Sequence, residues 1–213
     1  MLLNEWASLA IICILGAFSP GPSLMVILSL TASDGRKSGY IASIGHGIGI
    51  FVYALLSATG LAIALNTYRQ LFIAIQILGV IFLFFLGTRI IRSSFSTSTK
   101  VENVSQKPAR TFFSNAFLDG FLIAMLNPKI GVFFLSLFSQ FLVVGQTFAT
   151  HLGMATLAGV IDTFAYLMMV SLASTCIMFK FFNTYKKSIE FSFGFILLVL
   201  SISLCFKLSI EYL

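Results

Sequence analysis

Six long apolar stretches take up most of this 213-residue chain, and they limit its fold more than any other feature. An α-helix needs about 20 apolar residues to cross the hydrocarbon core of a membrane. Lipid offers the backbone no hydrogen bonds, so a continuous apolar segment of this length must be helical. The sequence therefore predicts an all-α integral membrane protein with about six transmembrane helices, at residues 6–32, 39–66, 70–91, 113–143, 148–178 and 189–209.

The composition excludes a soluble enzyme. The chain is 58% hydrophobic and only 9% charged, whereas soluble domains carry about 25% charged residues. The six segments and their loops leave no room for a soluble domain, so residues 1–213 form a single transmembrane domain. No G-x-S-x-G with a partner His, no H-E-x-x-H and no P-loop occurs, which indicates that the protein is not an enzyme.

The sequence also gives no sign of a cofactor, a metal site or a nucleic-acid partner. The three cysteines, Cys13, Cys176 and Cys205, lie far apart inside apolar segments and form no C-x-x-C pair. The net charge of +6 comes from basic loops between apolar runs, with no basic and aromatic surface for nucleic acid. The partners that we expect are membrane lipid and a small solute.

Basic residues predict which loops face the cytoplasm, where Lys and Arg are enriched. Arg69 and Lys207 lie on one side of the membrane and Lys129 lies within a segment. All the others lie in or beside the loops between segments 1 and 2, 3 and 4, and 5 and 6: Arg36, Lys37, Arg89, Arg92, Lys100, Lys107, Arg110, Lys180, Lys186 and Lys187. We expect these three loops to be cytoplasmic and both termini to face outward from a bacterial inner membrane. Five crossings with one re-entrant segment remain an alternative.

A polar linker divides the chain into two halves of three segments. The halves are residues 1–92 and 113–213, joined by a cytoplasmic linker at 93–112. Because each half crosses the membrane an odd number of times, the second half enters the membrane from the opposite face, as in many secondary transporters. Landmarks recur in the same order in both halves: Pro20 with Pro128, Phe51 and Tyr53 with Phe164 and Tyr166, and Gly79 with Gly194. We interpret this as two inverted three-helix repeats; chance matching of common residues is the alternative.

Proline motifs interrupt the first and fourth segments. Proline removes a backbone donor and disfavours helix in the residue before it, so we expect helices 1 and 4 to be broken there. A break at membrane depth persists where the backbone lines a cavity, and a helix that begins there directs its positive end into that cavity. The predicted substrate-binding residues are Ser19, Pro20, Gly21, Pro22, Asn127, Pro128 and Lys129. Simple packing kinks are the alternative.

Charged residues within segments are the candidates for ion coupling. Asp162 lies inside the fifth segment and Asp119 near the start of the fourth. Intramembrane carboxylates commonly carry protons or sodium ions in transport. Pairing of Asp162 with Lys129, alternating with protonation, would couple solute movement to protons. Snorkelling of Lys129 and helix capping by Asp119 are the alternative roles.

Three further residues are candidates for the cavity wall: His46, Tyr53 and Tyr166. His46 lies in a glycine-rich run whose Gly45 and Gly49 permit close helix contact, within the chain or in a homodimer. A hydrogen-bonded packing role for His46 and packing roles for the tyrosines are the alternatives. A metal site at His46 would need partner ligands at suitable spacing, and none is found.

These motifs together resemble the LysE/RhtB family of amino-acid exporters over nearly the whole chain. The resemblance lies in Phe18-Ser19-Pro20-Gly21-Pro22, Gly35-Arg36-Lys37-Ser38-Gly39, Gly45 to Gly49, Gly120-Phe121-Leu122, Asn127-Pro128-Lys129, Phe133-Phe134, Gln140-Phe141 and Asp162. It implies export of amino acids or close derivatives, driven by an ion gradient, with protons as the expected ion of an antiporter.

Two departures from the family pattern concern the substrate. Ile50 stands near the place where some members have an acidic residue, and Ser139 replaces a proline that often precedes the Gln-Phe pair. The first departure favours a neutral amino acid or a homoserine-lactone type of derivative over a cationic substrate. The alternatives are export of another solute, such as a metal cation, and a non-transporting membrane assembly protein.

Overall fold

The structure, a computed structural model, describes residues 1–19, 21–95 and 115–173, and within 187–209 the residues 187–188, 191–192, 194–199, 201–203, 205–206 and 208–209. In the first three ranges the chain forms α-helices and no strand, which confirms the all-α prediction for this part. The helices are α1 (Leu3–Phe18), α2 (Pro22–Asp34), α3 (Arg36–Thr67), α4 (Arg69–Phe95), α5 (Ala116–Met125), α6 (Pro128–Phe138) and α7 (Phe148–Ala173).

Three helices, α3, α4 and α7, are long and apolar enough to cross a membrane by themselves. The pairs α1 with α2 and α5 with α6 pass the same test only together, so the described residues hold up to five spans. The predicted sixth segment, 189–209, lies partly outside the described residues; its described part includes a shorter apolar helix, Gly194–Ser203.

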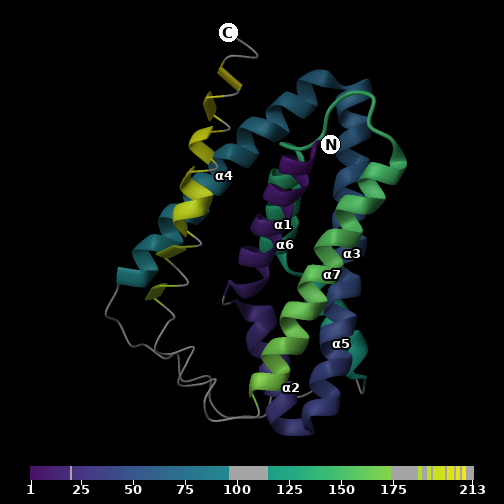
Figure 1. Ribbon diagram of the computed structural model, residues 1–213, viewed down its shortest axis with the longest axis vertical. Coiled ribbons are helices and arrows are strands. Elements are labelled where there is room, and N and C mark those ends of the chain that lie inside the picture. The colour runs from purple at the N-terminus through teal and green to yellow at the C-terminus, as the bar shows by residue number, and fades with distance from the viewer. Residues whose placement is uncertain are drawn as a thin grey trace.

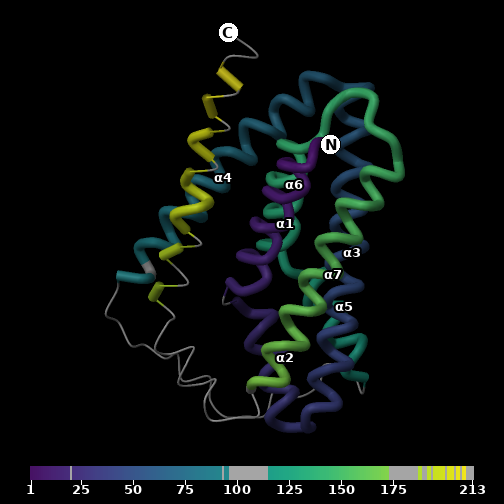
Figure 2. Tube along the Cα trace, in the orientation of Figure 1, coloured from purple at the N-terminus to yellow at the C-terminus, as the bar shows by residue number. Residues whose placement is uncertain are grey.

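The turn between α2 and α3 requires a glycine. Gly35 ends α2 and precedes α3 with φ of 86°, a conformation that residues with a β-carbon rarely adopt. The turn lies at the lower end of the bundle, whereas the N-terminus and the loop between α6 and α7 lie at the upper end (Figures 1 and 2). Because the turn is so short, α3 begins at Arg36, three residues before the predicted segment.

The long helix α3 packs closely against α5 and α7, which lie beside it in Figure 1. At the α3–α5 contact a β-carbon on Gly120 would collide with the backbone of Ala42, and one on Gly45 with the backbone of Phe117. Glycine lets two helix backbones approach in this way. The small-residue face of Gly45 and Gly49 therefore packs within the chain, against α5, and is not free for a dimer contact.

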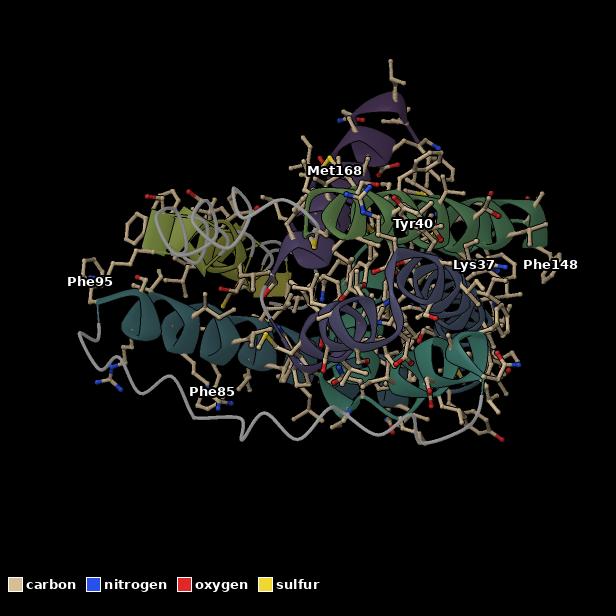
Figure 3. All side chains as sticks on the ribbon, turned by 90° about the horizontal axis from the view of Figure 1, so that it is seen from below. Lys37, Tyr40, Phe85, Phe95, Phe148 and Met168 are labelled. Atoms are coloured by element: carbon tan, nitrogen blue, oxygen red, sulfur yellow. The ribbon has the colours of Figure 1, made fainter. Side chains whose placement is uncertain are left out.

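Helix α4 runs along the side of the bundle, next to the described residues of the last segment, as the view from below in Figure 3 shows. Gly87 of α4 faces Gly194, and the rings of Phe95 and Phe191 meet edge to face with centroids 5.8 Å apart. The outward side of α4 is apolar, with Phe85 60% exposed. Such a surface is stable in contact with lipid and costly in water.

The end of α6 is tied to α4 by polar side chains. Gln76 Nε2 on α4 donates to the carbonyl of Ser139, 3.0 Å away, and Gln140 Nε2 donates to Ser139 Oγ at 3.1 Å. The bond from Gln76 satisfies a buried carbonyl where the helix ends. They fix α6, whose other end begins in the middle of the bundle.

Candidate functional site

The first functional element is the junction of α1 and α2, whose axes differ by 55°. Helix α1 ends at Phe18, Gly21 is extended with φ of −161°, and α2 starts at Pro22. Proline suits the first helical position, where its missing N–H has no helical partner to lose. Gly21 has no side chain to cap α2, so this helix start exposes backbone amides. Pro20 lies outside the described residues.

The second element is the junction of α5 and α6, whose axes differ by 56°. Here Asn127 is the N-cap, and its Oδ1 accepts a hydrogen bond of 3.0 Å from the backbone N–H of Lys129. Pro128 takes the first helical position of α6. Helix α6 therefore starts in the same way as α2, but its first turn is capped by a side chain.

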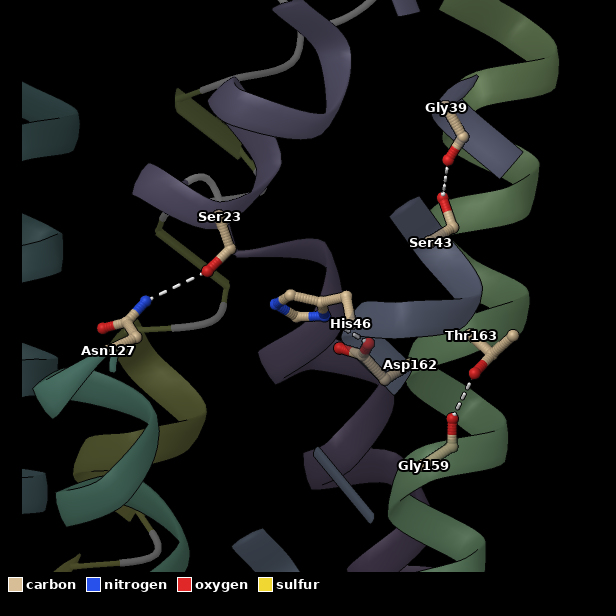
Figure 4. A network of polar contacts seen from close by, with 8 residues as sticks. All are labelled: Ser23, Gly39, Ser43, His46, Asn127, Gly159, Asp162 and Thr163. Atoms are coloured by element: carbon tan, nitrogen blue, oxygen red, sulfur yellow. Dashed lines mark hydrogen bonds and ion pairs between the residues drawn. The ribbon is translucent and has the colours of Figure 1, made fainter. Parts of the chain in front are cut away.

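Side chains connect the two junctions directly. Asn127 Nδ2 donates to Ser23 Oγ at 3.1 Å, and Lys129 Nζ donates to Ser19 Oγ at 3.2 Å. Figure 4 shows the first of these contacts, between the start of α2 and the start of α6. The two helix starts, separated by more than a hundred residues in the sequence, thus lie side by side.

A cavity of about 70 Å³ opens at this meeting point. By the same measure one water needs about 10–15 Å³, so the cavity holds several waters or a small solute group. It is bounded by α1, α2, α3, α6 and α7. Its wall is formed by Cys13, Gly16, Ala17, Ser19, Gly21, Pro22, Ser23, His46, Ile50, Asn127, Lys129, Ile130, Phe133, Phe134, Ala158, Asp162 and Tyr166.

A buried His–Asp pair closes one side of the cavity. His46 Nδ1 on α3 lies 2.7 Å from Asp162 Oδ2 on α7, and both residues are buried. The ring of Tyr166 stacks on the imidazole, with centroids 4.5 Å apart and planes 16° from parallel. Gly159 lets α3 and α7 approach this closely, because a β-carbon there would lie 2.8 Å from Phe51 Cβ.

The cavity wall therefore separates charges of opposite sign. The starts of α2 and α6 direct the positive ends of their dipoles at it, and the Lys129 ammonium lies beside them. Asp162, paired with His46, supplies the negative side. Between them the wall is apolar, with Ile50, Phe133 and Phe134. Such a wall can bind groups of either charge.

Two predicted residues line a different cavity. Asp119 on α5, 5% exposed, and Pro128 line a neighbouring cavity of about 440 Å³. Its wall is otherwise mostly apolar, and Pro22 and Asn127 border both cavities. Tyr53 contacts Gly131 of α6 and is not among the residues that line the central cavity.

The sequence analysis did not predict the hydrogen bond between Asp162 and His46; it proposed that Asp162 pairs with Lys129 in alternation with protonation. The structure gives Asp162 a histidine, and Lys129 donates to Ser19. A signal was present in the sequence: Gly47 and Gly159 mark the faces on which α3 and α7 touch, and His46 and Asp162 lie beside them. Ser23 was also missed. Among the described residues, no group of three His, Cys, Asp or Glu gathers in a way that could hold a metal ion.

Comparison with known proteins assigns the chain to a family. The profile of the LysE type translocators matches residues 14–208. An uncharacterized membrane protein of Pseudomonas aeruginosa is 33% identical over 129 residues, which cover 61% of this chain and 60% of that protein. One of Haemophilus influenzae is 28% identical over 200 residues, covering 93% and 92%.

A leucine efflux protein of Salmonella typhimurium is 30% identical over 156 residues, which cover 72% of this chain and 69% of that protein. No solved structure matches. The family profile covers most of the chain, including both helix junctions and the His46–Asp162 pair, and its members are membrane transport proteins. The chain belongs to the LysE type translocator family.

Proposed function

We propose that the protein is a secondary active exporter of amino acids with neutral side chains, driven by a proton gradient. The observation that carries this proposal is the central cavity, in which two helix starts and Lys129 face the His46–Asp162 pair. A carboxylate fits the positive side and an ammonium fits the negative side. The similarity to leucine efflux proteins supports an amino acid as the solute.

The wall of the cavity favours a neutral over a cationic side chain. Among the described residues that line it, Asp162 is the one carboxylate, and His46 already bonds it. Ile50, 3% exposed, lines the cavity and carries no charge, so a lysine or arginine side chain would find no counter-charge there. A homoserine lactone lacks the free carboxylate that the helix starts suit, which ranks it below the amino acid.

We further propose that the chain forms two inverted three-helix repeats in a bacterial inner membrane, with both termini outside. The nearly equal bends of 55° and 56° at the two proline motifs support a repeat, with α1 and α2 corresponding to α5 and α6. The basic loops between the first and second, third and fourth, and fifth and sixth segments would then face the cytoplasm. In this arrangement the substrate site lies between the repeats.

An efflux experiment tests the transport function. Cells with and without the protein are loaded with radiolabelled leucine, threonine, homoserine, homoserine lactone or lysine, and the label that leaves is followed over time. We expect faster efflux of at least one neutral amino acid, less effect on the lactone and none on lysine. If each of the five solutes leaves cells with and without the protein at the same rate, although the protein is present in the membrane, the proposal is contradicted. Faster efflux of lysine alone contradicts the proposal that the substrate has a neutral side chain.

A further inference from the structure

The hydrogen bond between His46 and Asp162 determines which ring nitrogen of the neutral histidine carries the proton. An ionised carboxylate can only accept hydrogen bonds, so Nδ1, 2.7 Å from Asp162 Oδ2, must be the donor. In a neutral imidazole the other nitrogen, Nε2, then has a free lone pair. A buried carboxylate that holds a histidine in one tautomer is a familiar arrangement in enzymes.

The Nε2 atom has no hydrogen-bond partner among the residues that the structure describes. It is buried, and in the described part of the chain no donor or acceptor forms a hydrogen bond with it. His46 is 1% exposed and lines the central cavity. Figure 4 shows the imidazole extending from α3 toward Ser23 and Asn127, where α2 and α6 begin. An unpaired buried acceptor costs free energy, so this atom suits a ligand that donates a hydrogen bond.

We propose that Nε2 of His46 accepts a hydrogen bond from the ammonium group of the substrate, and that a proton competes with the substrate for this lone pair. This inference rests on the proposed function and adds the group through which transport is coupled to protons. The carboxylate of the same substrate would lie at the starts of α2 and α6, near Lys129, on the other side of the cavity.

The competition between the proton and the substrate for Nε2 couples proton movement to substrate movement without a separate path for the proton. On one side of the membrane a proton binds Nε2, the hydrogen bond from the ammonium is lost, and the zwitterion leaves. The imidazolium remains paired with Asp162. On the other side the proton leaves and a substrate ammonium takes its place. One proton therefore crosses the membrane in one direction for each zwitterion that crosses in the other. Nε2 never binds the proton and the substrate ammonium at the same time.

Other titratable groups surround His46, so their contribution must be separated from its own. Asp162 and Tyr166 face it from α7, Cys13 from α1 and Lys129 from α6, all on the wall of the cavity. Asp119 of α5 lines the neighbouring cavity. Histidine is the side chain that ordinarily changes charge between about pH 5 and 8. We therefore assign the proton exchange to Nε2.

Binding of leucine to the purified protein in weakly buffered detergent solution tests the inference. We expect the wild-type protein to release about one proton per leucine bound at pH values where histidine is protonated. Its apparent Kd should rise about tenfold for each unit of further acidification. Protons are followed with an indicator dye and binding with radiolabelled leucine. Normal leucine binding without proton release overturns the inference and leaves the proposed function intact.

Two variants locate the proton. His46→Gln should bind leucine more weakly and with no proton release. The chain has one other histidine, His151, which is buried in α7 and is not among the residues that line the central cavity. The control His151→Gln should release protons as the wild type does. If His46→Gln binds leucine and still releases protons at the wild-type level, the inference is overturned. If the wild type binds none of leucine, threonine and homoserine, the proposed function and this inference both fail.

Discussion

At the scale of single residues, Lys129 is the positive group that we propose recognises the substrate. Its ammonium donates to Ser19 Oγ at 3.2 Å, and a β-carbon on Gly21 would lie 3.8 Å from its Nζ. A lysine within a membrane segment is costly unless its charge is compensated. The side chain lies beside the start of α2, where we propose that the carboxylate of the solute binds.

Replacing this lysine should weaken binding of the carboxylate selectively. Lys129→Gln keeps a hydrogen-bond donor on a shorter side chain and removes the charge. A hydrogen bond to a charged group contributes about 1.5–3 kcal/mol, so we expect the Kd of leucine to rise by about 10- to 100-fold. Leucinamide, which has no carboxylate, should bind both proteins about equally. The measurement is radioligand binding; a parallel loss for both ligands would contradict carboxylate recognition.

At the scale of elements, the contact between α3 and α5 sets the position of α6 and with it the site. Gly120→Val would press a side chain into the backbone of Ala42. Overpacking of this kind costs about 1–3 kcal/mol, so we expect a lower Tm in detergent and less folded protein. Gly60 of α3 is the matched control, because a β-carbon there meets nothing within 4 Å. Equal Tm values for Gly120→Val and Gly60→Val would contradict this close contact.

Single helices could be predicted well from the sequence. The segments predicted at 39–66 and 70–91 correspond to α3 (Arg36–Thr67) and α4 (Arg69–Phe95). Apolar length is a local property, so it needs no knowledge of the neighbours. Helix α4 continues past the predicted end because Arg92 in its last turn is compatible with the helix dipole.

Pairings between helices were harder to predict. His46 and Asp162 are 116 positions apart, and their contact depends on the rotation of α3 against α7. Asp119 was a candidate for the same site as Asp162, but it lines the neighbouring cavity, because α5 packs on the other face of α3. Of the residues in the two proline motifs, the central cavity is lined by Ser19, Gly21, Pro22, Asn127 and Lys129, whereas Pro128 lines the neighbouring cavity. The motifs did not show which side chains would bond across the cavity.

At the scale of the whole molecule, the orientation in the membrane is open to direct test. The loop after α6 and the turn before α3 lie at opposite ends of the bundle (Figure 1). In a variant without Cys13, Cys176 and Cys205, we expect Val144→Cys to react with a membrane-impermeant maleimide in intact cells. Lys37→Cys should react only after permeabilisation, because we propose that its basic loop faces the cytoplasm. Labelling of both sites from the same side would indicate a re-entrant segment and five crossings.

The central claim is that the substrate is held where α2 and α6 begin, and a structure with bound leucine in a lipid nanodisc tests it most directly. The account predicts the leucine carboxylate within hydrogen-bond distance of Lys129 Nζ and of the first amides of α2. It predicts the ammonium at Nε2 of His46. Leucine bound in the neighbouring cavity beside Asp119, or bound centrally with its carboxylate away from both helix starts, would contradict the account.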